Sequence, residues 1–228
     1  MFHIKLRESQ HVTIQHVSIS APGNSPNTDG IHIGHSSDIT IIDSHIATGD
    51  DCISIGDESS NVNISGIFCG PGHGISIGSL GRSAGEKDVS LVHVSNCTLS
   101  NTLNGARIKT IGPNSAALNV LTVTYQHIIM DNVHNPIVID QNYCPSGQCK
   151  KGDSSVEIKG VKFIDVRGSS GQAVAVKLDC SGSRPCQDIQ LSGVNINFKG
   201  QATTAACSNA DAKFIGSSQV PSKCSGPV

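Results

Sequence analysis

Three stretches, Asn27-Thr-Asp-Gly-Ile-His-Ile33, Gly49-Asp-Asp-Cys-Ile-Ser-Ile55 and Pro71-Gly-His-Gly-Ile-Ser-Ile77, repeat one pattern at intervals of 22 residues. Each begins with a polar turn and ends with isoleucines on alternate positions, and alternation of period two indicates a β-strand. A strand that returns at a steady interval, with no helical pattern between its copies, indicates a β-solenoid whose coils stack about 4.8 Å apart.

A second series of alternating strands is interleaved with the first. It comprises His11-Val-Thr-Ile, Asp38-Ile-Thr-Ile, Asn61-Val-Asn-Ile, Asp88-Val-Ser-Leu, Asn119-Val-Leu-Thr, Ser155-Val-Glu-Ile and Asp188-Ile-Gln-Leu. Counted from Val12, the steps between copies are 27, 23, 27, 31, 36 and 33 residues. A β-sandwich or jelly roll is the alternative, but it does not explain why one tetrapeptide type returns in phase. We therefore predict an all-β, single-stranded parallel β-helix.

Composition excludes several classes of partner. The chain has 228 residues, with 16 basic and 18 acidic side chains, so no strong positive surface is available for nucleic acid or anionic membrane. No stretch reaches the roughly 20 apolar residues of a membrane span. The chain has no Trp, so its core must consist mainly of stacked aliphatic side chains.

Nine cysteines indicate an oxidising compartment. Cys144 with Cys149, Cys180 with Cys186, and Cys207 with Cys224 form close pairs without zinc-site spacing. The odd count leaves one thiol over, for which we select Cys97. Two glycosylation sequons, at Asn63 and Asn96, agree with secretion.

The two ends of the chain differ. The N-terminus has no apolar run suited to a signal peptide, and the repeat begins near Val12 without a cap, so we expect upstream coils to be missing. The polar, cysteine-containing segment 200–228 breaks the repeat. We predict β-helix coils over 1–199 and a disulfide-stapled C-terminal cap over 200–228.

The repeat places ionisable residues on one face. Asp29, Asp51 and His73 occupy one position in three consecutive coils, about 5 Å apart from coil to coil. Asp50 adjoins this column, and the next coil places Arg107 and Lys109 on the same side of one strand.

Each of these residues has a structural alternative. Aspartate beside glycine is usually a turn residue, a single histidine is usually structural, and Arg-x-Lys on a strand is usually solvated. Stacked like charges repel, however, and a purely structural ladder favours Asn or Ser. We therefore interpret the cluster as functional.

Paired carboxylates are the catalytic groups of glycoside hydrolysis. Asp50, crowded by Asp29 and Asp51, is the candidate general acid, because neighbouring anions raise the pKa of a carboxyl group. The other two aspartates can hold and polarise a water molecule. Arg107 and Lys109 suit an anionic substrate.

Four signatures, Asn27-Thr-Asp-Gly, Gly49-Asp-Asp, Gly72-His-Gly and Arg107-Ile-Lys, together resemble the polygalacturonases of glycoside hydrolase family 28. The resemblance is greatest to plant members, through Cys69-Gly-Pro-Gly-His-Gly-Ile-Ser-Ile-Gly-Ser-Leu-Gly and Ile139-Asp-Gln-Asn-Tyr-Cys. It implies a right-handed β-helix that cuts pectin with inversion, without a metal or another cofactor, as a secreted monomer of the cell wall.

The resemblance also implies residue roles. Asp50 is then the general acid, Asp29 and Asp51 activate water, and His73 supports protonation. The implied sugar-binding residues are Asn27, Arg107, Lys109 and Tyr143, and a fourth disulfide joins Cys52 to Cys69.

Other readings stay open at this point. A pectate lyase shares the fold and substrate but uses calcium, and a relative acting on rhamnose-containing backbones is expected to lack Asp29. A non-catalytic pectin-binding homologue is the alternative from another class. Ser79-Leu-Gly-Arg, Glu86-Lys-Asp and Tyr143-Cys-Pro resemble the exo-acting pollen-type group, so we favour exo over endo action.

Overall fold

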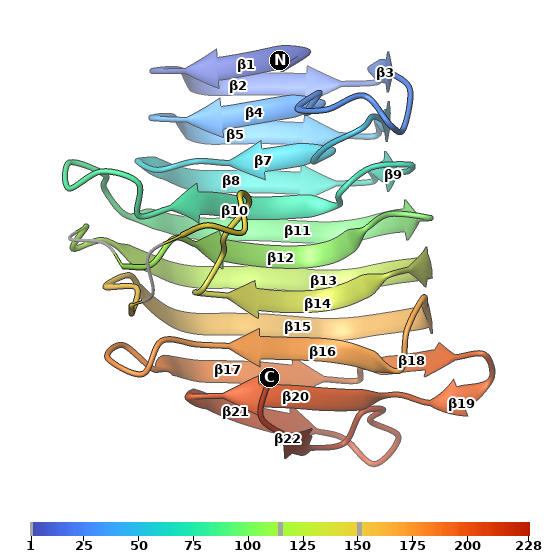
Figure 1. Ribbon diagram of the computed structural model, residues 1–228. Helices are drawn as coiled ribbons and strands as arrows, with labels where there is room; N and C mark the ends of the chain where they lie inside the picture. The colour runs from blue at the N-terminus through green and yellow to red at the C-terminus, as the bar shows by residue number, and fades with distance from the viewer. Residues whose placement is uncertain (1, 114–115, 150–151) are drawn as a thin grey trace.

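The computed structural model describes residues 2–113, 116–149 and 152–228, which form strands and turns and contain no helix. The strands stack as the coils of a right-handed parallel β-helix, with the chain running from one end of the stack to the other (Figure 1). This confirms the predicted fold class. No helix that could cross a membrane is present in the described part of the chain.

One sheet contains a single strand from every coil. Its order is β1 (Ile4–Arg7), β4 (Ile31–Gly34), β7 (Ile53–Ile55), β10 (Ile75–Leu80), β12 (Asn104–Thr110), β14 (Asn135–Asp140), β16 (Val174–Asp179), β20 (Thr204–Ser208) and β22 (Cys224–Gly226). Neighbours pair in parallel, with Ile31 opposite Ile53 and Ile53 opposite Ile75. The 22-residue interval of the sequence is thus one coil.

The other sheet forms the opposite wall. It contains β2 (Gln10–Gln15), β5 (Ser37–Ile42), β8 (Ser59–Ser65), β11 (Val89–Ser100), β13 (Asn119–Val133), β15 (Glu157–Ser170), β17 (Cys186–Ser192), β18 (Asn195–Phe198), β19 (Gln201–Ala202) and β21 (Ala210–Ile215). Three short strands, β3 (Ser18–Ser20), β6 (His45–Ala47) and β9 (Phe68–Cys69), pair with one another and with β11.

Columns of aliphatic side chains fill the space between the walls. One column consists of Ile33, Ile55, Ile77, Ile108, Ile139 and Leu178. All six are fully buried. Tyr125 and Phe163, stacked 5.6 Å apart, bring two fully buried large rings into the core. Because each coil contributes to the same columns, burial of apolar area stabilises the stack cooperatively.

The alignment of the second strand series needs a correction. Val62 lies opposite Val92, whereas the sequence pattern matches Val62 to Val89. The next step of the pattern, from Val89 to Val120, is confirmed. Leu91 lies between the two candidate valines with a φ of 56°. Because Leu91 has this left-handed conformation, Val89 and Val92 both face the core although they are three residues apart. Either valine therefore fits the alternating sequence pattern.

The C-terminal segment extends both walls before it ends. β20 pairs in parallel with β16, and β21 pairs in parallel with β17, so regular stacking continues past residue 200. A disulfide joins Cys207 to Cys224 and holds β22 against β20. The division into coils over 1–199 and a cap over 200–228 stays a prediction.

The first coil starts earlier than the sequence pattern suggested. Ile4 and Leu6 in β1 lie opposite Ile31 and Ile33. With two alternating apolar residues, this strand is too short to stand out in the sequence. Both side chains are half-buried, because only one neighbouring coil packs against them.

Candidate active site

The predicted column of ionisable residues is present. The register of β4, β7 and β10 places Asp29, Asp51 and His73 at equivalent positions of three coils, immediately before these strands. Backbone hydrogen bonds from Gly30 to Asp51 and from Cys52 to Gly74 continue the pairing through this region. The sequence correctly predicted that these residues stack.

A cleft of about 510 Å³ lies over the two aspartates of this column, and neither His73 nor Arg107 is among its lining residues. The predicted residues that line it are Asn27, Asp29, Asp50, Asp51, Lys109 and Tyr143. His32, Ser54 and Gly56 lie on its floor, and Ser79, Arg82 and Glu86 border it from the segment that follows β10. The sheet thus presents a polar surface outside and its aliphatic columns inside, as strand alternation requires.

Asp51 is held by two cations. Arg107 donates from Nη2 to Oδ1 at 2.7 Å, and Lys109 donates from Nζ to Oδ2 at 2.8 Å. Ser76 also donates to Oδ1, at 2.8 Å. The side chains of all four residues are buried, so both oxygens of Asp51 are held in a defined orientation.

Asp29 has a different environment. Ser54 donates a hydrogen bond to its Oδ2 at 2.8 Å, and no cation forms an ion pair with it among the described residues. Burial raises the pKa of Asp29, and the nearby charges of Asp51 and Asp50 act in the same direction. Asp29 therefore combines a raised pKa with a position in the cleft.

Asp50 differs from the sequence-based expectation. Burial acts to raise its pKa, but hydrogen bonds from His73 and from the backbone N–H of Asp51 outweigh burial, so the net shift is downward. The His73 Nδ1 lies 3.0 Å from Asp50 Oδ1, and the Asp51 N–H donates to the same oxygen at 2.8 Å. We had expected neighbouring anions to raise this pKa, but local hydrogen bonds dominate.

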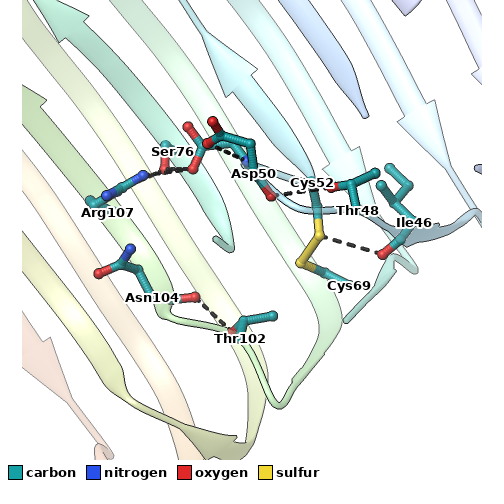
Figure 2. The surroundings of a disulfide bond; sticks show 10 residues. Ile46, Thr48, Asp50, Cys52, Cys69, Ser76, Thr102, Asn104 and Arg107 are labelled. Carbon is teal, nitrogen blue, oxygen red and sulfur yellow. Dashed lines mark hydrogen bonds and ion pairs between the residues drawn. A yellow bond between two sulfur atoms is a disulfide. The ribbon is translucent and has the colours of Figure 1, made fainter. Parts of the chain in front are cut away.

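Close packing holds the turn that carries Asp50. Gly49 passes so near the previous coil that a Cβ at this position would lie 1.9 Å from the Ser25 carbonyl oxygen, which only glycine allows. The disulfide between Cys52 and Cys69 lies beside the turn, and Thr48 donates to the Asp50 carbonyl at 3.1 Å (Figure 2). The proposed acid is thereby attached to a rigid part of the backbone.

Arg107 and Lys109 are not free surface cations. We predict that they contact an anionic sugar. In the structure, both form ion pairs with Asp51. Tyr143 lies over them, with its ring centre 5.2 Å from Lys109 Nζ and 5.9 Å from the Arg107 guanidinium. Beyond Tyr143, Arg107 lines a second cavity of about 380 Å³ together with Asn104, Asp140 and Lys177.

The loop after β10 has its own support. Glu86 accepts hydrogen bonds from the backbone N–H groups of Gly81, Arg82 and Ser83 at 2.6–2.9 Å. Arg82 in turn donates to Ser79 Oγ at 2.9 Å. This loop therefore borders the cleft with a defined conformation.

The serines of the cleft floor were missed from the sequence. Ser54 and Ser76 lie opposite each other in β7 and β10, and His32 and Arg107 continue the same row. The available signal was the middle residue of each Ile-x-Ile, which must point away from the aliphatic core.

One group could satisfy the geometry of a metal site. Atoms of Asp50, Asp51 and His73 lie within 4.8 Å of one another. Their oxygens and nitrogen already make hydrogen bonds and ion pairs within the protein. The absence of a catalytic metal stays a prediction.

The cysteines pair as expected. Cys52–Cys69, Cys144–Cys149, Cys180–Cys186 and Cys207–Cys224 are disulfides. Cys97 is free and buried, and burial raises the pKa of its thiol to about 12. The sequon residues Asn63 and Asn96 are exposed, so a glycan could be attached at either, but their modification stays a prediction.

Two solved structures share this fold. An endo-xylogalacturonan hydrolase from Aspergillus tubingensis superimposes with a TM-score of 0.80 at 22% identity, covering 100% of this chain and 68% of the other. A polygalacturonase from Erwinia carotovora ssp. carotovora superimposes with a TM-score of 0.66 at 29% identity, covering 93% and 54%.

The chain belongs to glycosyl hydrolases family 28, whose family model matches residues 1–220. It is 47% identical to an exopolygalacturonase of Platanus acerifolia, over 98% of this chain and 60% of the relative. It is 50% identical to a polygalacturonase of Prunus persica, over 98% and 57%. The chain thus spans about 60% of the length of these relatives.

Proposed function

We propose that this chain carries the active site of a polygalacturonase, which hydrolyses the α-1,4 bonds between galacturonic acid units of pectin. Family membership and the similarity to curated polygalacturonases support the reaction and the substrate class. The observation that carries the proposal is the meeting of three aspartates in one cleft, with only Asp51 ion-paired to Arg107 and Lys109.

Asp50 is the proposed general acid. Its side chain is 21% exposed and lines the cleft, so it can reach a glycosidic oxygen. Its lowered pKa favours the ionised form in the free protein. An anionic sugar bound beside Asp50 would favour the protonated form, because like charge disfavours ionisation.

Asp29 and Asp51 are proposed to hold the attacking water. Asp51, held in place by Arg107 and Lys109, is proposed to orient the water. Asp29 supplies an oxygen that can accept a proton as the reaction proceeds, since its pKa is raised. His73 contacts Asp50 and is proposed to support its protonation. Asn27 and Tyr143 line the cleft as proposed sugar contacts.

Inversion is the proposed stereochemistry. One carboxylate oxygen of Asp50 and one of Asp51 lie within 4.8 Å of each other. The two carboxyl groups of an inverting pair are typically about 6.5–9.5 Å apart, which is a larger separation. Both oxygens of Asp51 are nevertheless engaged by cations, and a nucleophile would have to give up these contacts. This engagement supports water activation over a covalent intermediate.

A reducing-sugar assay on polygalacturonate, with and without chelator, tests the reaction. We expect hydrolysis that chelator does not change, with the inverted anomer in early proton NMR spectra. Loss of activity with chelator, together with unsaturated products, would indicate a calcium-dependent lyase. Binding without turnover would indicate a pectin-binding homologue.

Exo action is the proposed mode. Its support is the motif resemblance of Ser79-Leu-Gly-Arg, Glu86-Lys-Asp and Tyr143-Cys-Pro to the exo-acting group, together with the similarity of the chain to an exopolygalacturonase. Ser79, Glu86 and Tyr143 line the cleft. Chromatography of early products should show monogalacturonate as the first product. A ladder of oligomers would instead indicate endo action.

We further propose a secreted, monomeric cell-wall enzyme. Four disulfides support an oxidising compartment, and the exposed sequons are compatible with glycosylation. Light scattering and mass spectrometry of the protein from a secreting plant host test these features.

A further inference from the structure

His32 lies on the cleft floor, in the strand β4 that follows Asp29. Its Nδ1 lies 2.8 Å from Ser54 Oγ, and Ser54 Oγ lies 2.8 Å from Asp29 Oδ2. The three side chains form one hydrogen-bonded chain across two coils. The mechanism above uses Asp29 but assigns nothing to His32.

The direction of these two hydrogen bonds fixes the tautomer of His32. The Ser54 hydroxyl has one proton, which it donates to the carboxylate of Asp29. The same hydroxyl must then accept from His32, so Nδ1 carries a proton. In a neutral imidazole the other nitrogen, Nε2, is then a hydrogen-bond acceptor.

The ring is neutral under ordinary conditions. Burial lowers the pKa of His32 to about 4, with Lys5 and Lys109 acting in the same direction and Asp51 and Asp57 opposing them. Phe2 stacks on one face of the ring at 4.3 Å and limits its rotation. The donor and acceptor ends of His32 therefore have fixed directions.

The acceptor end faces open space in the cleft. A Cβ at Gly34 or Gly56 would lie 3.5 or 3.6 Å from Nε2, so the two glycines flank this atom without covering it. Nε2 has no hydrogen-bond partner among the described residues and is not one of their buried unpaired atoms. His32 and Gly56 both line the cleft.

We propose that His32 Nε2 accepts a hydrogen bond from a hydroxyl group of the sugar unit bound beside Asp29, so that this position selects a hydroxyl and disfavours a carboxylate. The inference rests on the proposed function. The lone pair of Nε2 repels a carboxylate, whereas a hydroxyl group can donate a hydrogen bond to Nε2. Within an α-1,4-linked galacturonate chain, the free hydroxyls are those on C2 and C3. Lys109, which lines the cleft, would then mark the carboxylate position, and His32 a hydroxyl position.

Two substitutions separate the two ends of the ring. His32→Asn can still donate toward Ser54 but is too short to place an acceptor at Nε2. His32→Gln is long enough to place its Oε1 near Nε2. We expect kcat/KM on trigalacturonate to fall about 2- to 12-fold in His32→Asn, the range of one neutral hydrogen bond, and to stay within about 2-fold of wild type in His32→Gln.

Deoxy substrates test the contact directly. Removing the recognised hydroxyl, with 2-deoxy and 3-deoxy units compared, should lower kcat/KM for the wild type but cause little further loss in His32→Asn. A deoxy penalty that survives unchanged in His32→Asn, or equal losses in the two variants, would overturn the proposal. Thermal unfolding of both variants identifies a loss that comes from folding.

Calorimetry with trigalacturonate separates this inference from the proposed function. If the wild-type chain neither binds nor hydrolyses trigalacturonate, the proposed function fails and this inference fails with it. If it hydrolyses trigalacturonate but shows no deoxy penalty that depends on His32, only the hydroxyl contact is wrong.

Discussion

Asp29 and Asp51 occupy the same position in adjacent coils, and each accepts a hydrogen bond from a buried serine, yet their electrostatic surroundings differ. Asp51 is 1% exposed and pairs with Arg107 and Lys109. Asp29 is 8% exposed, its pKa is raised by burial, and it forms no ion pair among the described residues.

The difference arises from the side chain that forms a hydrogen bond with each serine. Ser76 receives a hydrogen bond from Arg107 Nε at 3.0 Å, whereas Ser54 lies next to His32. A cation beside one serine and a neutral ring beside the other give the two carboxylates different surroundings within one repeat. A stacked fold can thus place acid–base groups of unlike character side by side, which general acid–base catalysis requires.

Removing the charge of each carboxylate should have the largest effects, and the two effects should differ. Asp51→Asn leaves two buried cations without their partner, so we expect activity to be abolished and the free energy of unfolding to fall by about 3–5 kcal/mol. Asp29→Asn should also abolish activity but leave stability at neutral pH unchanged or increased, because it removes a buried unpaired anion. Denaturant unfolding of both variants measures this. Equal destabilisation would mean that the two sites do not differ as described.

Asp50→Asn tests the residue between the two sites. It removes a proton donor while retaining the size of the side chain, so kcat should fall about 10²–10⁴-fold with little change in substrate binding. Steady-state kinetics and calorimetry with trigalacturonate measure the two quantities. Activity within a few-fold of wild type would assign the acid to another carboxyl group, for which Asp29 with its raised pKa is the first candidate.

The two cations that pair with Asp51 should control substrate specificity. Arg107→Ala and Lys109→Ala should lower kcat/KM on polygalacturonate about 10- to 150-fold, since a charge-assisted contact is lost. Highly methyl-esterified pectin should be a poor substrate for the wild type, and the variants should discriminate less between the two. Lys162→Ala, an exposed substitution in β15 on the opposite wall, is the control. An unchanged preference in the variants would show that these cations serve Asp51 alone.

The smallest expected effect is a pH-dependent difference in stability. The pKa of Asp29 is higher in the folded than in the unfolded state. Its favourable contribution to the free energy of unfolding is therefore complete below the unfolded pKa of about 4 and is lost as pH rises through the folded pKa. The melting temperature of Asp29→Asn should therefore match wild type near pH 3.5 and exceed it increasingly toward pH 7. Asp211→Asn, which alters an exposed carboxylate in β21, should show no such trend. A constant difference across this range would contradict the prediction.

Much of the molecule could be predicted from the amino-acid sequence. The alternation of Ile31, Ile33, Ile53 and Ile55 predicted strands, and their 22-residue interval predicted the parallel stack. The same interval predicted that Asp29, Asp51 and His73 would align. Regular spacing is sufficient here, because in-register coils convert a sequence offset directly into a spatial position.

The register of the longer strands could not be predicted in this way. Val89 and Val92 both fit the alternating pattern, and the left-handed residue Leu91 between them decides which valine faces Val62. The choice depends on the neighbouring coils, since a shift moves apolar side chains from the core to the surface. Periodicity within one segment does not contain that information.

The coil, the aliphatic columns and the stacking of the ionisable residues thus follow from the amino-acid sequence alone, because each comes from a repeated local pattern. The partner that each ionisable group finds was visible only in the folded protein. Arg107 and Lys109 pair with Asp51 and not with Asp29, and His73 lowers the pKa of Asp50 that neighbouring anions had been expected to raise. Such outcomes depend on burial and on distances of about 3 Å between residues as many as 58 positions apart, which spacing along the chain does not specify.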